Sequence, residues 1–232
     1  MEEKIGLKFY TNYEMTEEYR RLRTNIKLHG KRVRTIVFTS CHPGEGKSEV
    51  SIQTAMSLCQ LGNKVIYVDS DLRKPSLEER VDVKEYPVGL SQYLAGISEL
   101  ESIIIHTATD GFDMITSGAV PPNPTELLAG EGFKGLLTEL KAMYDYIVID
   151  SPPCDNVVDA VVIANVCDGV VIVIQEKRTS KRMLLRVKTE LARTNTILLG
   201  AVLNKVDFNK ITKYKKYKRY YKKQYVQRTG TD

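Results

Sequence analysis

One stretch combines two glycines, a lysine and a hydroxyl group in the spacing of a phosphate-binding loop: Pro43-Gly44-Glu45-Gly46-Lys47-Ser48. An apolar run, Arg34–Phe38, precedes it, and helical periodicity follows to about Leu61. In such a unit, backbone N–H groups surround a phosphate chain, the lysine reaches the β- and γ-phosphate oxygens, and the serine hydroxyl binds Mg²⁺. Cys41 stands where this motif commonly has its first glycine. The alternative interpretation is a glycine turn at the start of a helix.

Aspartates follow two further apolar runs, which are Val65–Val68 and Tyr146–Ile149. The carboxyl ends of parallel strands share one edge of a sheet. We therefore expect four side chains to converge on the Mg²⁺ side of the phosphate: Ser48, Asp69, Asp71 and Asp150. Mg²⁺ that keeps several waters needs only one or two carboxylates, so a third is free to orient or deprotonate a nucleophile. Each aspartate taken singly could instead cap the following helix.

The stretch Asn204-Lys205-Val206-Asp207 is a literal NKxD, the base-reading signature of GTPases. A strand-end asparagine also reads adenine in the wider class of nucleotide-binding proteins. Guanine recognition, adenine recognition and a simple polar turn all stay open at this position.

The C-terminal stretch is strongly basic and rich in tyrosine. Residues 210–228 contain nine Lys or Arg and no acid, and subtracting these from the net charge of +5 leaves −4 for the rest. Five tyrosines are interleaved with them: Tyr214, Tyr217, Tyr220, Tyr221 and Tyr225. Because residues 211–232 have no core pattern, we expect a disordered tail. Such a tail could bind nucleic acid or anionic lipid, and its tyrosines are accessible phosphoryl acceptors.

Composition is that of a soluble globular protein, with 232 residues, 42% hydrophobic and 27% charged. No run approaches the roughly 18 apolar residues of a membrane span, and the start does not resemble a signal peptide. We therefore expect a cytoplasmic chain with one α/β domain. The four cysteines lack CxxC spacing, which supports neither a zinc site nor disulfides. Cys41 and Cys154 flank the nucleotide loops, so their oxidation is expected to block binding.

Strands and helices are predicted to alternate. The predicted strands are Val33–Thr39, Lys64–Asp69, Phe112–Thr116, Tyr146–Asp150, Gly169–Ile174 and Thr196–Leu203. The predicted helices run from the cap Thr16 to His29, from Lys47 to Leu61, from the cap Asn123 (with Pro124 first and Glu126 reaching back) to Met143, and from Ser180 to Arg193. Doubly apolar strands separated by helices predict an α/β fold of the P-loop NTPase type, whose mostly parallel central sheet has helices on both faces.

Together these motifs closely resemble the bacterial tyrosine kinases of capsule and exopolysaccharide synthesis, in the form of a separate cytoplasmic subunit of Gram-positive systems. The tyrosine-rich terminus and five other features carry the resemblance: Pro43–Ser48 as Walker A, Asp69–Arg73 as Walker A′, Asp150–Pro153 as Walker B, the segment Pro121–Leu128, and the pattern Glu17, Arg20 and Arg23. Any one of them is common, but the set in this order is specific.

The resemblance implies that ATP with Mg²⁺ is the phosphoryl donor and that the five tail tyrosines are the acceptors. It implies that Lys47 stabilises the transferred group, that Ser48, Asp71 and Asp150 hold the metal, and that Asp69 orients or deprotonates the tyrosine. The nucleotide would contact eight residues: Pro43, Gly44, Glu45, Gly46, Lys47, Ser48, Glu49 and Asn204.

The resemblance also implies partners. The helix bearing Glu17, Arg20 and Arg23 would dock on a neighbouring subunit in a homo-oligomeric ring. A membrane-spanning activator would hold the chain at the inner face of the membrane, a cognate phosphatase would reverse the reaction, and no nucleic acid is expected. The predicted domains are an N-terminal arm with the oligomerisation helix (1–30), a P-loop kinase domain (31–210) and the tail (211–232).

Three rival functions differ at identifiable residues. Partition or division ATPases carry a signature lysine where this chain has His42, and they lack a tyrosine tail. A GTPase has no use for the Asp69-Ser70-Asp71 run. A nucleotide-dependent membrane-surface binder would use the basic tail without catalysis.

Overall fold

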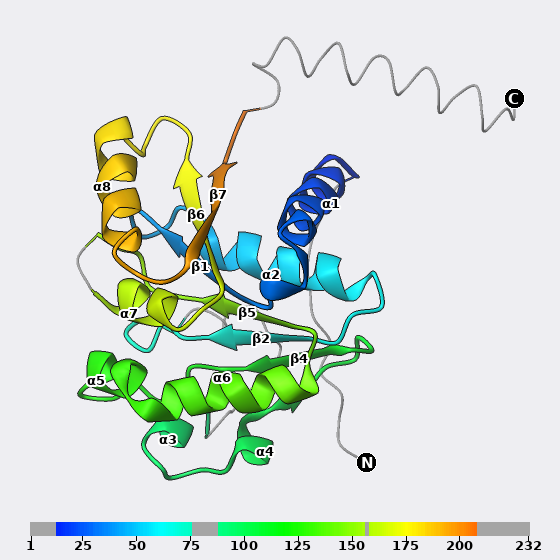
Figure 1. The fold of residues 1–232 in the computed structure, drawn as a ribbon, viewed down its shortest axis with the longest axis vertical. Helices are drawn as coiled ribbons and strands as arrows, with labels where there is room; N and C mark the ends of the chain where they lie inside the picture. The colour runs from blue at the N-terminus through cyan, green and yellow to red at the C-terminus, as the bar shows by residue number, and fades with distance from the viewer. Residues whose placement is uncertain (1–12, 76–87, 156–157, 208–232) are drawn as a thin grey trace, which may run out of the picture.

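Strands of consecutive apolar residues build the centre of the molecule. The computed structural model describes residues 13–75, 88–155 and 158–207 (Figure 1). The strands are β1 (Thr35–Ser40), β2 (Val65–Asp69), β3 (Ile105–His106), β4 (Phe112–Ile115), β5 (Tyr146–Asp150), β6 (Gly169–Gln175) and β7 (Ile197–Asn204). They form one sheet in the order β3-β4-β2-β5-β1-β6-β7. Every neighbouring pair is parallel except β3 and β4, which are antiparallel.

The register of the central strands decides where polar side chains emerge. Asp150 at the end of β5 is paired with Phe38 of β1 on one side and with Asp69 of β2 on the other. The two carboxylates therefore stand on neighbouring strands at the same carboxyl edge, as the sequence predicted.

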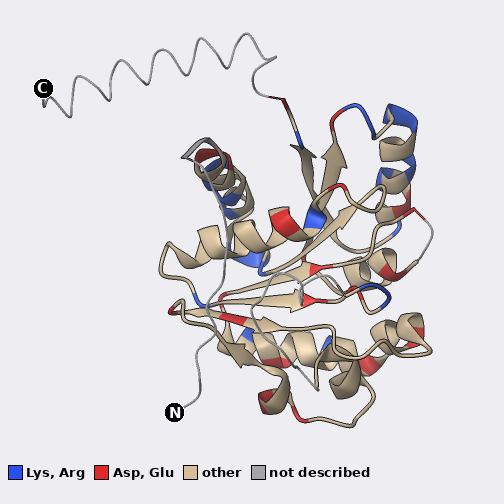
Figure 2. Ribbon diagram, turned by 180° about the vertical axis from the view of Figure 1, so that it is seen from behind, with Lys and Arg blue, Asp and Glu red and all other residues tan. Residues whose placement is uncertain are grey.

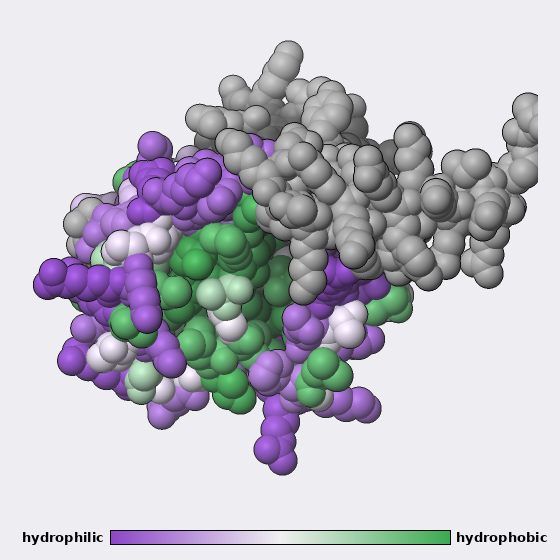
Figure 3. All heavy atoms as spheres, turned by 90° about the horizontal axis from the view of Figure 1, so that it is seen from above, coloured by the Kyte–Doolittle hydropathy of each residue, from purple (hydrophilic) through white to green (hydrophobic). Residues whose placement is uncertain are grey.

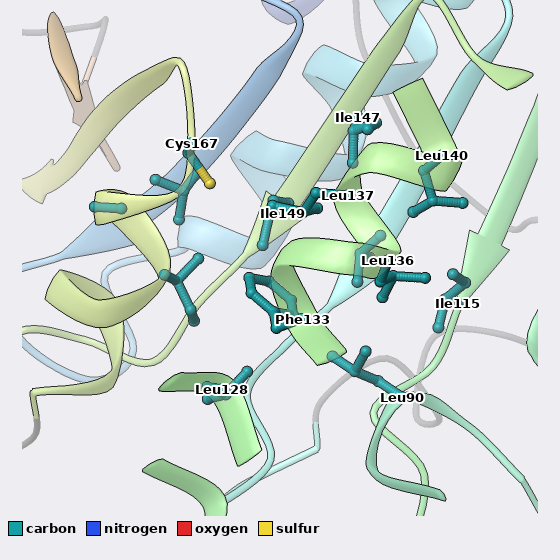
Figure 4. Packing of buried hydrophobic residues seen from close by; sticks show 14 of the residues in the cluster. Leu90, Ile115, Leu128, Phe133, Leu136, Leu137, Leu140, Ile147, Ile149 and Cys167 are labelled. Atoms are coloured by element: carbon teal, nitrogen blue, oxygen red, sulfur yellow. The ribbon is translucent and has the colours of Figure 1, made fainter. Parts of the chain in front are cut away.

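Helices cover both faces of the sheet. They are α1 (Tyr13–Leu28), α2 (Lys47–Cys59), α3 (Leu90–Leu94), α4 (Leu100–Ile103), α5 (Pro124–Ala129), α6 (Glu131–Met143), α7 (Asp159–Asn165) and α8 (Lys181–Leu191). A short 3₁₀ turn, Gly30–Arg32, follows α1. One core cluster packs α1 and α2 against one face of the sheet. A second cluster packs the helices from α3 through α8 against the opposite face. Figure 4 shows Phe133, Leu136 and Leu140 of α6 over Ile147 and Ile149 of β5.

The α/β fold with a mostly parallel sheet is confirmed, and all six predicted strands lie within two residues of the observed bounds. The single helix predicted from Asn123 to Met143 is wrong. The backbone at Gly130 is extended, with φ −72° and ψ 162°, and it separates α5 from α6. Asn123 and Pro124 hold the predicted N-cap and first positions of α5, but the Asn123 side chain makes no capping hydrogen bond.

The N-terminal helix differs from its prediction in both position and contacts. It begins at Tyr13, three residues before the predicted cap at Thr16. Arg20 pairs with Glu17 on the same helix, whereas Arg23 donates to the carbonyl oxygen of Ser57 at 2.7 Å. The α1 helix is therefore fastened to the carboxyl end of α2, and a subunit interface through this face stays a prediction.

β7 is an edge strand and is only partly covered. It leaves Ile197 47% and Leu203 53% exposed, and a groove of about 460 Å³ separates β7 from α1. Figure 3 shows hydrophobic side chains gathered in the middle of one face, between hydrophilic borders. Among the helices of the described ranges, none combines the length and the apolar character needed to cross a membrane. The predicted N-terminal arm (except its helix) and the tyrosine tail fall outside those ranges.

Candidate functional site

The loop between β1 and α2 has the backbone of a phosphate cradle. Gly44 and Gly46 have φ of +76° and +88°, a left-handed conformation that glycine adopts without steric cost. Gly46 is the N-cap of α2, and Lys47 and Ser48 begin the helix, followed by Glu49. The N-terminus and positive dipole of this 13-residue helix face the loop, which suits a bound anion.

Lys47 lies at the centre of a carboxylate cluster at the carboxyl edge of the sheet. Its Nζ atom is 3.3 Å from Asp150 Oδ2, 3.5 Å from Asp71 Oδ2 and 3.3 Å from Ser48 Oγ. Burial alone would lower the pKa of Lys47, but the charges of Asp150, Asp71 and Asp69 outweigh it and raise the pKa. The predicted convergence of these side chains is therefore found.

Asp69 differs chemically from the other carboxylates. It is completely buried, and burial, followed by repulsion from Asp150, raises its pKa to about 7. The charge of Lys47 and a hydrogen bond from the backbone N–H of Asp71 to Asp69 Oδ1 (3.1 Å) oppose this rise. Asp69 is thus a carboxyl group that can accept or release a proton near neutral pH.

Two carboxylate oxygens in this cluster lack hydrogen-bond partners. They are Asp69 Oδ2 and Asp150 Oδ1, both buried. Unpaired buried carboxylate oxygens are costly unless a cation or donor meets them. Asp150 Oδ1 therefore fits a Mg²⁺ ion beside Ser48, and Asp69 Oδ2 fits a hydroxyl donor. Within the described ranges, no three or more His, Cys, Asp or Glu side chains are grouped so that they could hold a metal ion by themselves. A Mg²⁺ ion here would accordingly draw its other ligands from the nucleotide and water.

Glu45 supports the loop from inside. Its carboxylate accepts hydrogen bonds from the backbone N–H groups of Cys41 (2.8 Å) and His42 (2.9 Å) and from the hydroxyl of Thr179. The Glu45 side chain is completely buried and occupied by these hydrogen bonds. Any contact of Glu45 with the nucleotide, as predicted, would therefore be made by its backbone. Sequence reasoning missed Thr179, although its place before the helical pattern of α8 marked a turn.

Asn204 reaches the same loop from the end of β7. Its Nδ2 atom donates to the carbonyl oxygen of Glu45 at 2.9 Å, and Lys205 Nζ donates to that of Gly44 at 2.7 Å. The NKxD stretch therefore lies beside the phosphate loop. These contacts do not distinguish adenine recognition from guanine recognition.

His42 and the cysteines complete the surroundings of the loop. His42 Nδ1 lies 2.8 Å from Asp155 Oδ2, in the segment after β5. Cys41 is completely buried, and burial, with the nearby charge of Glu45, raises its pKa to about 12. Burial also raises the pKa of Cys154. Since the reactive species is the thiolate, these environments argue against the predicted oxidation of Cys41 and Cys154.

A glycine loop, a helix N-terminus and strand-end carboxylates on a mostly parallel sheet define a P-loop nucleotide-binding protein. A family model described as an AAA domain matches residues 33–198. The chain is 39% identical over 193 residues to the tyrosine-protein kinase CpsD of Streptococcus agalactiae serotype III (strain NEM316), with 83% of each chain covered. It belongs to the family of bacterial tyrosine-protein kinases.

Solved structures agree with this placement. The kinase domain of the Escherichia coli tyrosine kinase ETK is similar with a TM-score of 0.78 and 32% identity, covering 82% of this chain and 75% of that one. The chimerical protein CapA2B2 is similar with a TM-score of 0.78 and 34% identity, covering 82% of this chain and 84% of that one.

Proposed function

We propose that this chain is a protein-tyrosine kinase that transfers the γ-phosphoryl group of ATP to the C-terminal tyrosines of a neighbouring copy and so regulates capsule or exopolysaccharide synthesis. Family membership supports the activity. The observation that supports the chemistry is the position of Lys47 among Ser48, Asp71 and Asp150. A buried cation in such a cluster would stabilise the charge of a transferred phosphoryl group.

Each residue of the cluster has a distinct task in this proposal. The N–H groups of the loop and of α2 hold the phosphates, while Lys47 stabilises the transferred group. Ser48, Asp71 and Asp150 would hold Mg²⁺, which when bound neutralises phosphate charge. Asp69 takes the phenolic proton as the tyrosine oxygen bonds to the γ-phosphorus and the bond to the ADP oxygen breaks. The products are phosphotyrosine and ADP.

The acceptor tyrosines belong to residues 208–232, so the proposal of transfer in trans rests on the family resemblance. The same resemblance supports a homo-oligomeric ring, a membrane-spanning activator that holds the chain at the inner face of the membrane, and a cognate phosphatase.

A mixing experiment tests both the activity and its direction. One variant, Lys47→Met, keeps the tail tyrosines, and a second changes all five tail tyrosines to Phe. With Mg·ATP and the activator segment, neither alone should gain tail phosphate, whereas their mixture should show it by mass spectrometry on the Lys47→Met tail. Lys64→Met, which changes an exposed lysine, is the matched control and should behave as wild type. An unlabelled wild-type tail under these conditions would refute the kinase proposal.

A further inference from the structure

The segment Pro121–Leu128 contributes to the family resemblance but supplies none of the groups around Lys47. Its Pro124 begins α5, and Thr125 is the next residue of that helix. The helices α5 and α7 lie side by side (Figure 1). The hydroxyl of Thr125 meets Asp159, the first residue of α7, and Arg73 from the loop after β2.

These three side chains form a closed hydrogen-bonded cluster. Arg73 Nε donates to Asp159 Oδ2 at 2.6 Å, and its Nη2 donates to Asp159 Oδ1 at 3.2 Å and to Thr125 Oγ1 at 2.8 Å. Thr125 Oγ1 in turn donates to Asp159 Oδ1 at 2.6 Å. Asp159 is completely buried, while 42% of the Arg73 side chain is exposed. This bidentate contact with Asp159 fixes both the orientation and the distance of the Arg73 guanidinium group.

The cluster is two residues from a carboxylate of the site. The backbone N–H of Lys74 donates to Asp71 Oδ1 at 3.1 Å, and that of Asp71 donates to Asp69 Oδ1 at 3.1 Å. These bonds leave Asp71 Oδ2 as the oxygen that faces Lys47 Nζ. Because Arg73 lies between Asp71 and Lys74, fixing its side chain also fixes the turn that holds the Asp71 carboxylate.

We infer that Thr125 and Asp159 are positioning residues: they anchor Arg73 on α5 and α7, and Arg73 in turn holds the Asp71 carboxylate in the orientation needed for phosphoryl transfer. This inference rests on the role proposed above for Asp71. It assigns a task to the Pro121–Leu128 segment and to the arginine of Asp69–Arg73, neither of which touches the phosphate loop through the contacts described.

The test replaces only the hydroxyl of the cluster. Thr125→Val keeps the shape of the side chain but leaves Arg73 Nη2 and Asp159 Oδ1 one partner short, whereas Thr125→Ser keeps the hydroxyl. Thr138→Val is the matched control, since Thr138 Oγ1 bonds only to the carbonyl oxygen of Lys134 on an exposed turn of α6. Autophosphorylation of the full chain is measured against Mg²⁺ concentration well below the Tm of each variant, together with binding of a fluorescent ATP analogue.

A positioning role predicts a specific pattern. Thr125→Val should lower kcat and raise the Mg²⁺ concentration for half-maximal rate, each by about 10-fold, as loss of an outer-shell partner commonly does. Thr125→Ser and Thr138→Val should stay close to wild type, and the affinity for the ATP analogue should change little. A Thr125→Val enzyme with the Mg²⁺ dependence and kcat of wild type, or with only a lower Tm, would overturn the inference.

Asp71→Asn separates this inference from the proposal beneath it. If Asp71→Asn is inactive and Thr125→Val is normal, the anchor alone is refuted. If Asp71→Asn is as active as wild type, the role of Asp71 is wrong and the inference falls with it.

Discussion

Gly46 in the phosphate loop and Gly62 after α2 both have a left-handed backbone, but an added side chain would meet different surroundings at the two positions. A Cβ atom at Gly46 would lie 2.2 Å from Asn204 Nδ2, with φ at +88°. Gly62, at the end of the turn after α2, has a similar φ of +80° but open space around it. The pair therefore separates backbone strain from a clash with the asparagine that holds the loop.

We predict that Gly46→Ala abolishes nucleotide binding, because Asn204 must leave the Glu45 carbonyl oxygen and the loop loses its support. Gly62→Ala should cost only the left-handed strain of about 1–2 kcal/mol in the free energy of unfolding and bind nucleotide normally. Urea unfolding and titration with a fluorescent ATP analogue measure both effects. Tight binding by Gly46→Ala would contradict the proposed role of this contact.

The reactive residues of the site were largely predictable, because they sit at fixed places in local motifs. The position of Lys47 follows from the glycine loop and helix start around it, and the positions of the aspartates follow from the apolar strands that they end. The supporting residues were not. Three supporting residues come from segments far away in sequence: Asp155, Asp159 and Thr179. Their contacts could not be predicted, because they depend on how the strands are ordered in the sheet.

At the scale of the elements, Asp168 fastens the beginning of β1 to α6. Its Oδ2 atom accepts hydrogen bonds from the backbone N–H groups of Arg34 (2.9 Å) and Thr35 (2.8 Å), and Oδ1 pairs with Lys141 Nζ at 2.9 Å. Burial would raise the pKa of Asp168, but the bonds from Thr35, Lys141 and Arg34 outweigh it and lower the pKa. The ionised carboxylate is therefore favoured in the folded state.

We predict that Asp168→Asn lowers the free energy of unfolding by about 2–3 kcal/mol at pH 7, since charged hydrogen bonds are lost and an N–H donor faces other donors. A lowered pKa adds stability above the unfolded value of about 3.9, and that stability is lost as pH falls through the folded value. The difference between wild type and variant should thus shrink in acid. Urea unfolding measures it, with the exposed Glu131→Gln as control. A pH-independent difference would exclude the linkage.

The elements that sequence reasoning missed are short or interrupted. α3 and α4 have five and four residues and β3 has two, so none shows a full period of its pattern. The break at Gly130 lies within an amphipathic run that continues on both sides. No proline marks it, and its local signal, Gly130 and Gly132 on either side of Glu131, was not used. Long, doubly apolar strands were found because burial on both faces leaves no polar alternation to confuse with a helix.

For the whole molecule, two of the three arginines of α1, Arg20 and Arg23, predict different outcomes. Arg20 is about half exposed and pairs only with Glu17, while Arg23 holds α1 against α2 through Ser57. Arg20→Ala should change stability by less than about 1 kcal/mol, and Arg23→Ala should lower it by about 1.5–3 kcal/mol. If this face forms the ring, both variants should reduce the mass in solution. Light scattering and thermal unfolding measure the two effects, with Lys31→Ala as control. A full-size Arg20→Ala oligomer would exclude the interface.

The charge of the molecule is divided between two regions of opposite sign. Figure 2 shows acidic residues at the ends of the central strands, where Asp69, Asp71 and Asp150 surround a single lysine. The nine positive charges of residues 210–228 face a remainder of −4. If each chain binds its neighbour's tail, as proposed above, attraction of this kind should strengthen the oligomer before phosphoryl transfer.

Full phosphorylation of the tail should abolish this electrostatic attraction. Each phosphotyrosine carries about −1.5 to −2, so five of them add about −8 to −10 and cancel the nine positive charges of the tail. The acidic site then no longer attracts the tail, and the oligomer should dissociate. Light scattering before and after incubation with Mg·ATP measures the mass, and the variant with all five tail tyrosines changed to Phe is the control that must stay assembled. Because surface attraction is screened by salt, raising the ionic strength should weaken the unphosphorylated oligomer in the same direction; an unchanged mass after complete phosphorylation would rule the mechanism out.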